Sequence, residues 1–344
     1  MEAKKKDTIG NLKTLWSTNP LFSTLVALII MIIFQTLALG FDYPSFGKWF
    51  DVWLNNWFNI LRNNANIGIV ALGMTFVIIS GGIELAVGST LVAVSAVLMV
   101  IIDNGPNGLL KNMGVTGVPV FVIGIVIALL LSTLLGTGTG LLITKGKIPP
   151  FIATLGTMKV LRSVTQHFMQ SQSPMVPVGF LNISNFKIFG KYLLPIFYWV
   201  ILAVLLHYVA TKTTFGRRVY AIGSNERAAK LSGINVNKVR VGVYALIGLL
   251  VGIASIIQVA RIGSMDFANA GSGYEMDAIA AVIVGGTSMS GGKGTIAGTV
   301  MGTLIIAVMN NLLNLLGVPP FLREAFKGFI VVIAVLLQKN DSSN

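Results

Sequence analysis

Few side chains in this sequence could carry out chemistry, and their spacing does not form a catalytic set. The 344 residues contain two histidines, His167 and His207, which lie far apart, and no cysteine. We find no paired carboxylates, no nucleophile beside a base, and no cluster with the spacing of metal ligands. We therefore expect neither a catalytic centre nor a bound metal, and disulfide and thiol chemistry are ruled out.

A stripe of polar side chains lies on the helix predicted at 150–170. At about 100° per residue, Val160, Val164 and Phe168 fall opposite this stripe. Charged residues within an apolar segment are costly unless they face protein or water. The stripe therefore either pairs inside a helix bundle or lines a polar translocation path, and both interpretations stay open. The stripe consists of Lys159, Arg162, Gln166 and Gln170, and weaker candidates for the same path are Asn66, Asn310 and Asn314.

Two glycine-rich segments, GGIELAVG at 81–88 and GGTSMSGG at 285–292, share one template. Each lies between two apolar runs, and glycine permits backbone conformations and close approaches that other residues do not. Paired breaks of this kind are typical of transporters built from repeats. We predict that both segments are turns beside half-helices. The template positions are Gly81, Gly82, Glu84, Gly88, Gly285, Gly286, Gly291 and Gly292.

Two chemical functions that these glycine-rich segments could suggest, a nucleotide-binding P-loop and a proton relay through Glu84, are less favoured than a structural role. A P-loop needs Gly, four residues, Gly-Lys and then Ser or Thr, whereas Thr287 stands five residues before Gly292 and Gly294 follows Lys293. The chain therefore has no ATPase site of its own. For Glu84 we favour a structural role beside the start of the next helix, where a carboxylate suits the helix dipole, over a proton relay.

The longest basic segment is 212–240, KTTFGRRVYAIGSNERAAKLSGINVNKVR, with seven basic residues and one acid. We predict a short helix inside it, capped by Ser224 and ended by Gly233 in the left-handed conformation. Glu226 and Lys230 have the spacing of a favourable ion pair. A solvated loop helix and a docking helix fit this pattern equally well. One face of the helix carries only small residues: Asn225, Ala228, Ala229 and Ser232.

The composition predicts the elements that must position these residues. With 54% hydrophobic and 11% charged residues, the chain has more apolar surface than a soluble core can bury. We predict an all-α, polytopic membrane helix bundle and, without a long polar linker, one membrane domain over 1–344. The predicted spans are 20–40, 63–80, 86–102, 119–143, 150–170, 192–211, 241–260, 276–287, 295–316 and 321–338, of which the eighth is too short to span alone.

The lysines and arginines predict the orientation. With the N-terminal segment 1–19 in the cytoplasm, fifteen of them lie on the inside and eight on the outside, and two fall within a span. This bias favours both termini, and the loop 212–240, in the cytoplasm. It also accounts for the net charge of +13 without a nucleic-acid partner.

Several segments resemble known families. NERAAKLSGINV resembles the EAA-type coupling loop of bacterial ATP-binding-cassette (ABC) importer permeases, with Glu226, Ala228, Ala229 and Gly233 at the motif positions and Arg227 as a departure. ALGMTFVIISGGIELAVGS, KIPPFIATLGTM, GYEMDAIAAVIVGGTSMSGGKGT and NNLLNLLGV are similar to signature segments of ribose/galactoside-type sugar permeases. Glu84 replaces the usual Asp of that family, and Ala86 its frequent Ser.

The resemblance implies a permease subunit that imports a monosaccharide, with about ten transmembrane helices, Gly-broken half-helices and a type II ABC importer-like fold. It implies a cytoplasmic ABC ATPase that binds the ATP, a periplasmic or lipid-anchored sugar-binding protein, a second identical or homologous permease, and surrounding lipid in a bacterial inner membrane. The permease itself would need no cofactor. The alternatives are a nucleoside or branched-chain amino acid permease, and an ion-coupled secondary transporter that uses Glu84 or Asp277.

Overall fold

The computed structural model describes residues 20–106 and 108–341, so the predicted cytoplasmic segment 1–19 lies outside the described residues. All regular elements of this part are helices, which confirms the predicted all-α class. They are α2 (Pro20–Leu39), α3 (Phe46–Ile79), α4 (Val87–Ile101), α5 (Leu109–Asn112), α6 (Val118–Thr144), α7 (Pro150–Met169), α8 (Val178–Asn185), α9 (Leu194–Lys212), α10 (Thr214–Ser224), α11 (Glu226–Leu231), α12 (Val236–Ile262), α13 (Tyr274–Val284), α14 (Ile296–Leu315) and α15 (Pro320–Asp341).

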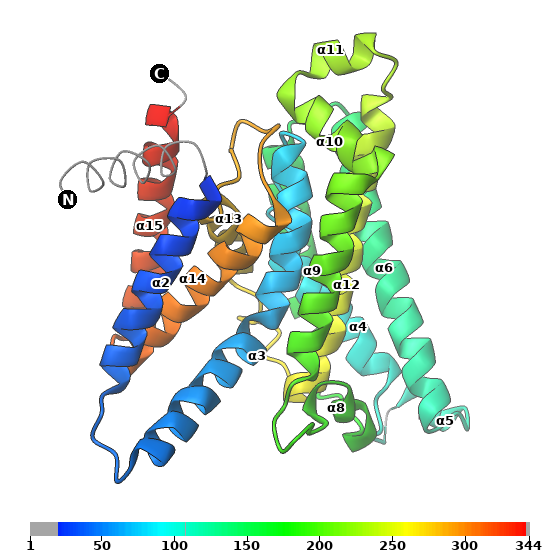
Figure 1. Cartoon of the computed structure of the whole chain (residues 1–344). Coiled ribbons are helices and arrows are strands. Elements are labelled where there is room, and N and C mark those ends of the chain that lie inside the picture. Colours follow the sequence, from blue (N-terminus) through cyan, green and yellow to red (C-terminus); the bar gives the residue numbers. More distant parts are fainter. Residues whose placement is uncertain (1–19, 107, 342–344) are drawn as a thin grey trace, which may run out of the picture.

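The helices form an elongated polytopic bundle (Figure 1). Helices α2, α14 and α15 make one side, α4, α6, α9 and α12 make the other, and α3 runs obliquely between them. Helices α10 and α11 project from one end of the bundle, and α5 and α8 lie at the opposite end. In the described part, α2, α3, α6, α9, α12 and α14 are long and apolar enough to cross a membrane. The remaining predicted spans correspond to α4, α7, α13 and α15, so ten crossings stay a prediction.

The largest error in the predicted boundaries concerns α3, which begins at Phe46 instead of near residue 63. Its first turns carry aromatic rings on one side, and the rings of Phe46, Trp49 and Trp53 stack in sequence with centroids 5.6 and 6.4 Å apart. Asp, Asn and Arg residues alternate with these rings and lower the local hydropathy. A search for uninterrupted apolar runs therefore misses this part of the helix.

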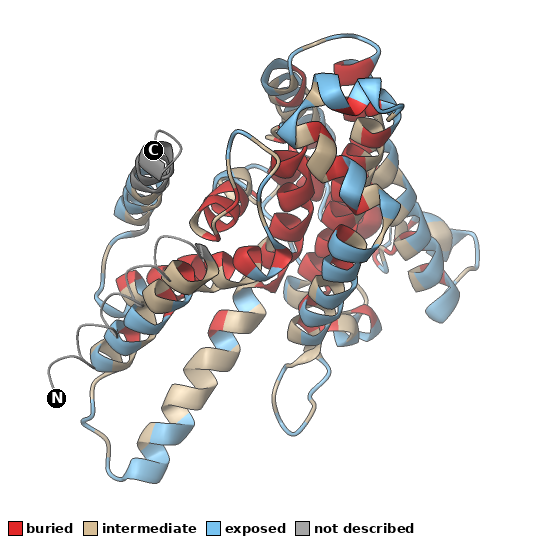
Figure 2. Cartoon of the chain, turned by 45° about the horizontal axis from the view of Figure 1, so that its top comes forward, coloured by how far each residue is buried: buried red, intermediate tan, exposed pale blue. Residues whose placement is uncertain are grey.

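The core lies where α3, α12, α13 and α14 meet, as Figure 2 shows, whereas the first half of α3, apart from the buried Ile60, is exposed or partly exposed. Small residues let these helices approach closely. A Cβ on Gly136 of α6 would lie 2.3 Å from the Tyr244 carbonyl oxygen of α12, and one on Gly298 of α14 would lie 2.1 Å from the Gly285 carbonyl oxygen. Since lipid offers no hydrophobic drive between helices, such close packing is what holds membrane helices together.

Candidate functional site

The basic segment 212–240 contains two helices, not the single one predicted. Thr213 caps α10 by accepting a hydrogen bond from the Gly216 N–H at 3.2 Å. Asn225 then caps α11 through its Oδ1, which accepts from the Ala228 N–H at 3.0 Å. The predicted cap, Ser224, is instead the last residue of α10. The prediction was wrong because Asn225 offers an equally good capping side chain one residue later.

The end of α11 has the predicted geometry. Gly233 has φ of +79°, and its N–H donates to the Lys230 carbonyl oxygen at 3.0 Å. The Ile234 N–H donates to the Ala229 carbonyl oxygen at 3.1 Å. This pair of bonds is a Schellman motif, which turns the chain from α11 into α12.

Glu226 anchors α11 at its start. The predicted ion pair with Lys230 is present at 2.6 Å, and Arg240 of α12 adds a second at 2.9 Å. Hydrogen bonds from Lys230 and then Arg240 hold the pKa of Glu226 below its usual value. The carboxylate therefore joins α11 to α12, a link that the linear spacing of Glu226 and Arg240 did not reveal.

The face of small residues predicted for α11 is partly exposed and partly buried in the structure. Asn225, Ala228 and Ser232 are exposed, but Ala229 is only 4% exposed and packs into the main core. Ala229 is therefore a packing residue and is removed from the predicted contact face. Sequence reasoning missed Leu231, which is 91% exposed. An exposed leucine at the tip of a projecting helix is a candidate contact residue, and its apolar type inside a basic island was the available signal.

Main-chain atoms connect the basic segment 212–240 to the rest of the helix bundle. The Gly292 N–H donates to the Ile79 carbonyl oxygen at 2.9 Å, at the end of α3. A Cβ on Gly223 of α10 would lie 1.7 Å from the same oxygen and 2.5 Å from the Gly292 nitrogen. Three segments that are far apart in the sequence therefore meet through main-chain atoms. We call Ile79, Gly223 and Gly292 the backbone junction.

The two glycine-rich turns have the same geometry, but in a register one residue away from the sequence template. Gly81 has φ of +77° and donates to the Ile78 carbonyl oxygen, whereas Gly286 has φ of +86° and donates to that of Ile283. The matching Schellman residues are thus Gly81 and Gly286, not Gly81 and Gly285. The sequence template aligned identical residue types, whereas the φ values and hydrogen bonds depend on where each preceding helix ends.

Glu84 lies between the first turn and α4, where it is buried. Its Oε1 accepts a hydrogen bond from the Ala86 N–H, the residue before α4, at 2.6 Å. Close by, a Cβ on Gly88 would lie 2.0 Å from the Gly271 carbonyl oxygen. The structural role expected for Glu84 therefore has a geometric basis.

The polar stripe of α7 divides into two pairs. Arg162 donates to the Ala270 carbonyl oxygen at 2.6 Å, and Gln166 donates to that of Ala268 at 3.0 Å. These two side chains hold the segment between α12 and α13. Lys159 of α7 and Gln170, the residue directly after this helix, are exposed. Only this second pair remains free to face a path or another subunit.

The asparagines predicted for the path lie on other helices. Asn66 of α3 is buried and donates to the Gln258 Oε1 of α12 at 2.5 Å. Asn310 of α14 has a buried Oδ1 without a hydrogen-bond partner, and Asn314 is exposed. Helix α7 packs on α4 and α6, whereas α14 packs on α2, α3 and α13. The predicted path residues therefore do not form one cluster.

Residues 56–335 match the family model described as "Branched-chain amino acid transport system / permease component", and the chain belongs to this family of transport permeases. It is 46% identical to the "Ribose import permease protein RbsC" of Bacillus subtilis (strain 168), over 84% of this chain and 86% of that protein. It is 41% identical to the protein of the same name from Escherichia coli (strain K12), over 91% and 92%. It is 31% identical to the "Xylose transport system permease protein XylH" of Escherichia coli (strain K12), over 95% and 94%. No solved structure matches.

Proposed function

We propose that this chain is the membrane permease subunit of an ABC importer for a monosaccharide, and that ribose is the first substrate to test. The observation that carries the proposal is the similarity to ribose and xylose permeases over 84–95% of this chain. The projecting α11, with its exposed Ala228 and Leu231, supports it because it offers a contact surface for a separate motor.

In this proposal a separate cytoplasmic ATPase binds ATP and docks on α11. A sugar-binding protein delivers the substrate at the opposite end of the bundle, and a second permease, identical or homologous, completes the path. The chain would be a multi-pass protein of the bacterial inner membrane with both termini in the cytoplasm. The exposed Lys159 of α7 and Gln170, directly after this helix, would face the path or the second subunit.

The description of the matched family favours a second candidate substrate class, the branched-chain amino acids. Nucleosides remain a third candidate substrate class. An ion-coupled secondary transporter would need a buried carboxylate free to bind the ion. Glu84 instead binds the Ala86 N–H, and Asp277 binds Lys327 at 3.0 Å, so the geometry supports this alternative less.

The test is uptake of labelled ribose into proteoliposomes that contain the permease, its ATPase and its binding protein. Uptake should require ATP, persist in the presence of an uncoupler, and be inhibited by ribose rather than leucine. Uptake that follows leucine would move the protein to the amino acid class. Uptake that an uncoupler abolishes without regard to ATP would establish secondary transport.

Topology and the path have separate tests, which are simplified by a sequence without cysteine. A single Ser232→Cys should react with a membrane-impermeant thiol reagent only from the cytoplasmic side; reaction from outside would reverse the orientation.

Gln170→Cys should react with a water-soluble reagent in the assembled dimer, whereas the exposed apolar Val164→Cys should be protected by lipid. Equal protection of both would remove Gln170 from the path.

A further inference from the structure

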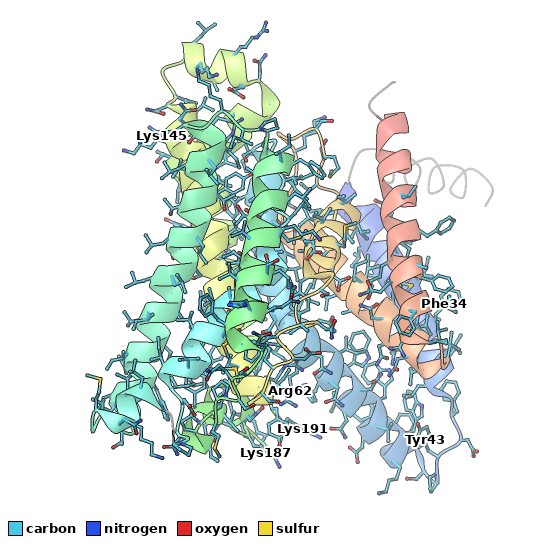
Figure 3. All side chains as sticks on the ribbon, turned by 180° about the vertical axis from the view of Figure 1, so that it is seen from behind. Phe34, Tyr43, Arg62, Lys145, Lys187 and Lys191 are labelled. Carbon is cyan, nitrogen blue, oxygen red and sulfur yellow. The ribbon has the colours of Figure 1, made fainter. Side chains whose placement is uncertain are left out.

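An open pocket lies where α2 passes into α3, at the end of the molecule opposite α10 and α11. Its volume is about 220 Å³, whereas a single water needs only roughly 10–15 Å³, so the pocket can admit a group of several atoms. Figure 3 shows Tyr43 at this end, beyond Phe34 of α2 and far from Lys145. We call the residues that line it the aromatic pocket: Phe41, Tyr43, Ser45, Phe46 and Trp49.

Trp49 fixes the shape of the aromatic pocket. Its indole Nε1 donates a hydrogen bond to the Gly40 carbonyl oxygen at 2.9 Å, which ties α3 to the chain just after α2. The rings of Phe41 and Phe46 stack on Trp49, with centroids 5.5 and 5.6 Å from its own. Phe41 and Phe46 are nonetheless 63% and 77% exposed. Their ring faces are therefore held in place, yet much of their surface is left uncovered by the described part of the protein.

Two charges of opposite sign adjoin the aromatic pocket in the chain. Asp42 stands between Phe41 and Tyr43, and Lys48 directly precedes Trp49; both charged residues are exposed. Neither belongs to an ion pair among the described residues. The faces of aromatic rings attract organic cations, quaternary ammonium groups above all, and an ammonium side chain is a common partner of phosphate. The pocket therefore complements a ligand that carries an ammonium group and a phosphate close together.

The surface next to the aromatic pocket faces lipid. Exposed apolar side chains recur on one side of α2 at helical spacing and lead toward Phe41; they are Ile30, Ile33, Phe34 and Leu37. The pocket continues this stripe just beyond Leu39, the last residue of α2, where aromatic residues typically gather at the membrane–water interface. A phospholipid whose acyl chains lie along α2 brings its headgroup to the aromatic pocket.

We propose that the aromatic pocket binds the headgroup of a zwitterionic phospholipid, with the ammonium group against the exposed rings and Asp42 and the phosphate at Lys48. The occupied leaflet is the extracytoplasmic one in the proposed orientation. The bound lipid anchors the exposed first turns of α3 at the membrane surface. A neutral sugar would use neither charge, and phosphatidylglycerol offers a phosphate without an ammonium group, so both suit the pocket less well.

The experiment uses native mass spectrometry to identify the phospholipids that stay bound when the permease complex is released from nanodiscs of phosphatidylethanolamine and phosphatidylglycerol in equal amounts. The wild type should retain phosphatidylethanolamine in excess. Phe41→Leu combined with Phe46→Leu removes two ring faces but keeps apolar side chains, and should reduce this excess by about two- to fivefold, as expected for a cation over exposed rings. Asp42→Asn should reduce it as well. The matched control is Phe34→Leu combined with Phe50→Leu, the same change at two exposed positions that do not line the pocket.

Three results would overturn the inference. The wild type could retain both lipids equally, or the pocket variant could keep the full preference; in either case the pocket does not select an ammonium group. An equal loss of preference in the control variant would assign the effect to aromatic residues at the interface in general. A changed number of permease chains with unchanged lipid preference would show that the pocket contacts a second copy of this chain. Melting temperature in detergent verifies the fold of each variant, and no outcome depends on the transported sugar, so the proposed function is tested separately.

Discussion

Arg240 Nη2 donates a 2.9 Å hydrogen bond to Glu226 Oε2, and this contact joins the first residue of α11 to the second turn of α12. Lys230 binds the other carboxylate oxygen at 2.6 Å. The orientation of the projecting helix therefore depends on one ionised acid.

This dependence predicts a pH effect. Because hydrogen bonds lower the pKa of folded Glu226 below its ordinary value of 4.5, the ion pairs stabilise the fold fully above about that pH. Their contribution is lost as the pH falls through the lowered pKa. Glu226→Gln should reduce stability by roughly 0.5–1 kcal/mol at neutral pH, as expected for partly exposed pairs. The difference in melting temperature between Glu226→Gln and wild type should shrink in acid, whereas the same difference at every pH would contradict the assignment.

Docking of the ATPase should depend on the exposed side of α11. Leu231→Asp should weaken co-purification of the ATPase by about tenfold and leave the permease monodisperse, because Leu231 is 91% exposed and supports no internal packing. Ala229→Trp should instead destabilise the permease itself, since its site is buried in the core. The control is Arg227→Ala, a change at another exposed residue of the same helix. Normal co-purification with Leu231→Asp would place the docking surface elsewhere.

The backbone junction should tolerate no side chain at position 223. Gly223→Ala would place a carbon 1.7 Å from the Ile79 carbonyl oxygen, so α10 or α3 must move. We expect a loss of roughly 1–3 kcal/mol, as for other overpacked sites, together with loss of ATP-driven uptake. Gly138→Ala in α6 is the matched control, because a Cβ there meets no atom within 4 Å. The measurements are melting temperature and uptake. If Gly223→Ala and Gly138→Ala had the same stability, the backbone junction would be able to accommodate the added carbon without cost.

Two buried glutamines should respond in opposite ways to the same substitution. Gln35 of α2 is fully buried, and neither its Nε2 nor its Oε1 has a hydrogen-bond partner. Gln35→Leu should therefore raise stability by about 1 kcal/mol, since an unpaired amide is costly. Gln258→Leu should lower it by roughly 1–3 kcal/mol, because Asn66 loses its acceptor. Thermal unfolding in detergent would measure both, and a destabilised Gln35→Leu would show that Gln35 has a partner.

The helical class and the approximate position of each predicted span could be derived from the sequence, because apolar runs of about twenty residues have few other interpretations. The first half of α3 could not be predicted in this way. Its signal is a row of aromatic rings on one side of a polar helix, and a hydropathy search averages that signal away. The cap of α11 was missed for a smaller reason, since Ser224 and Asn225 are both good caps and only the end of α10 decides between them.

The candidate site was harder to predict, because it depends on contacts between distant residues. The pair Glu226–Lys230 is local and was predicted, whereas Arg240 comes from the next helix. The side of α11 that carries Ala229 looked free in the sequence and is covered by the bundle. The α7 stripe showed which residues share a side, but not that Arg162 and Gln166 would bind the segment before α13.

Helix α3 continues for 34 residues, which is about 51 Å at 1.5 Å per residue, against a hydrocarbon core of about 30 Å. Helix α3 is continuous from its exposed aromatic first turns, through Arg62 at its midpoint, to Ile79 of the backbone junction at its last residue. Because each turn of the helix is hydrogen-bonded to the next, a displacement of the exposed half would be passed along the same helix to the backbone junction.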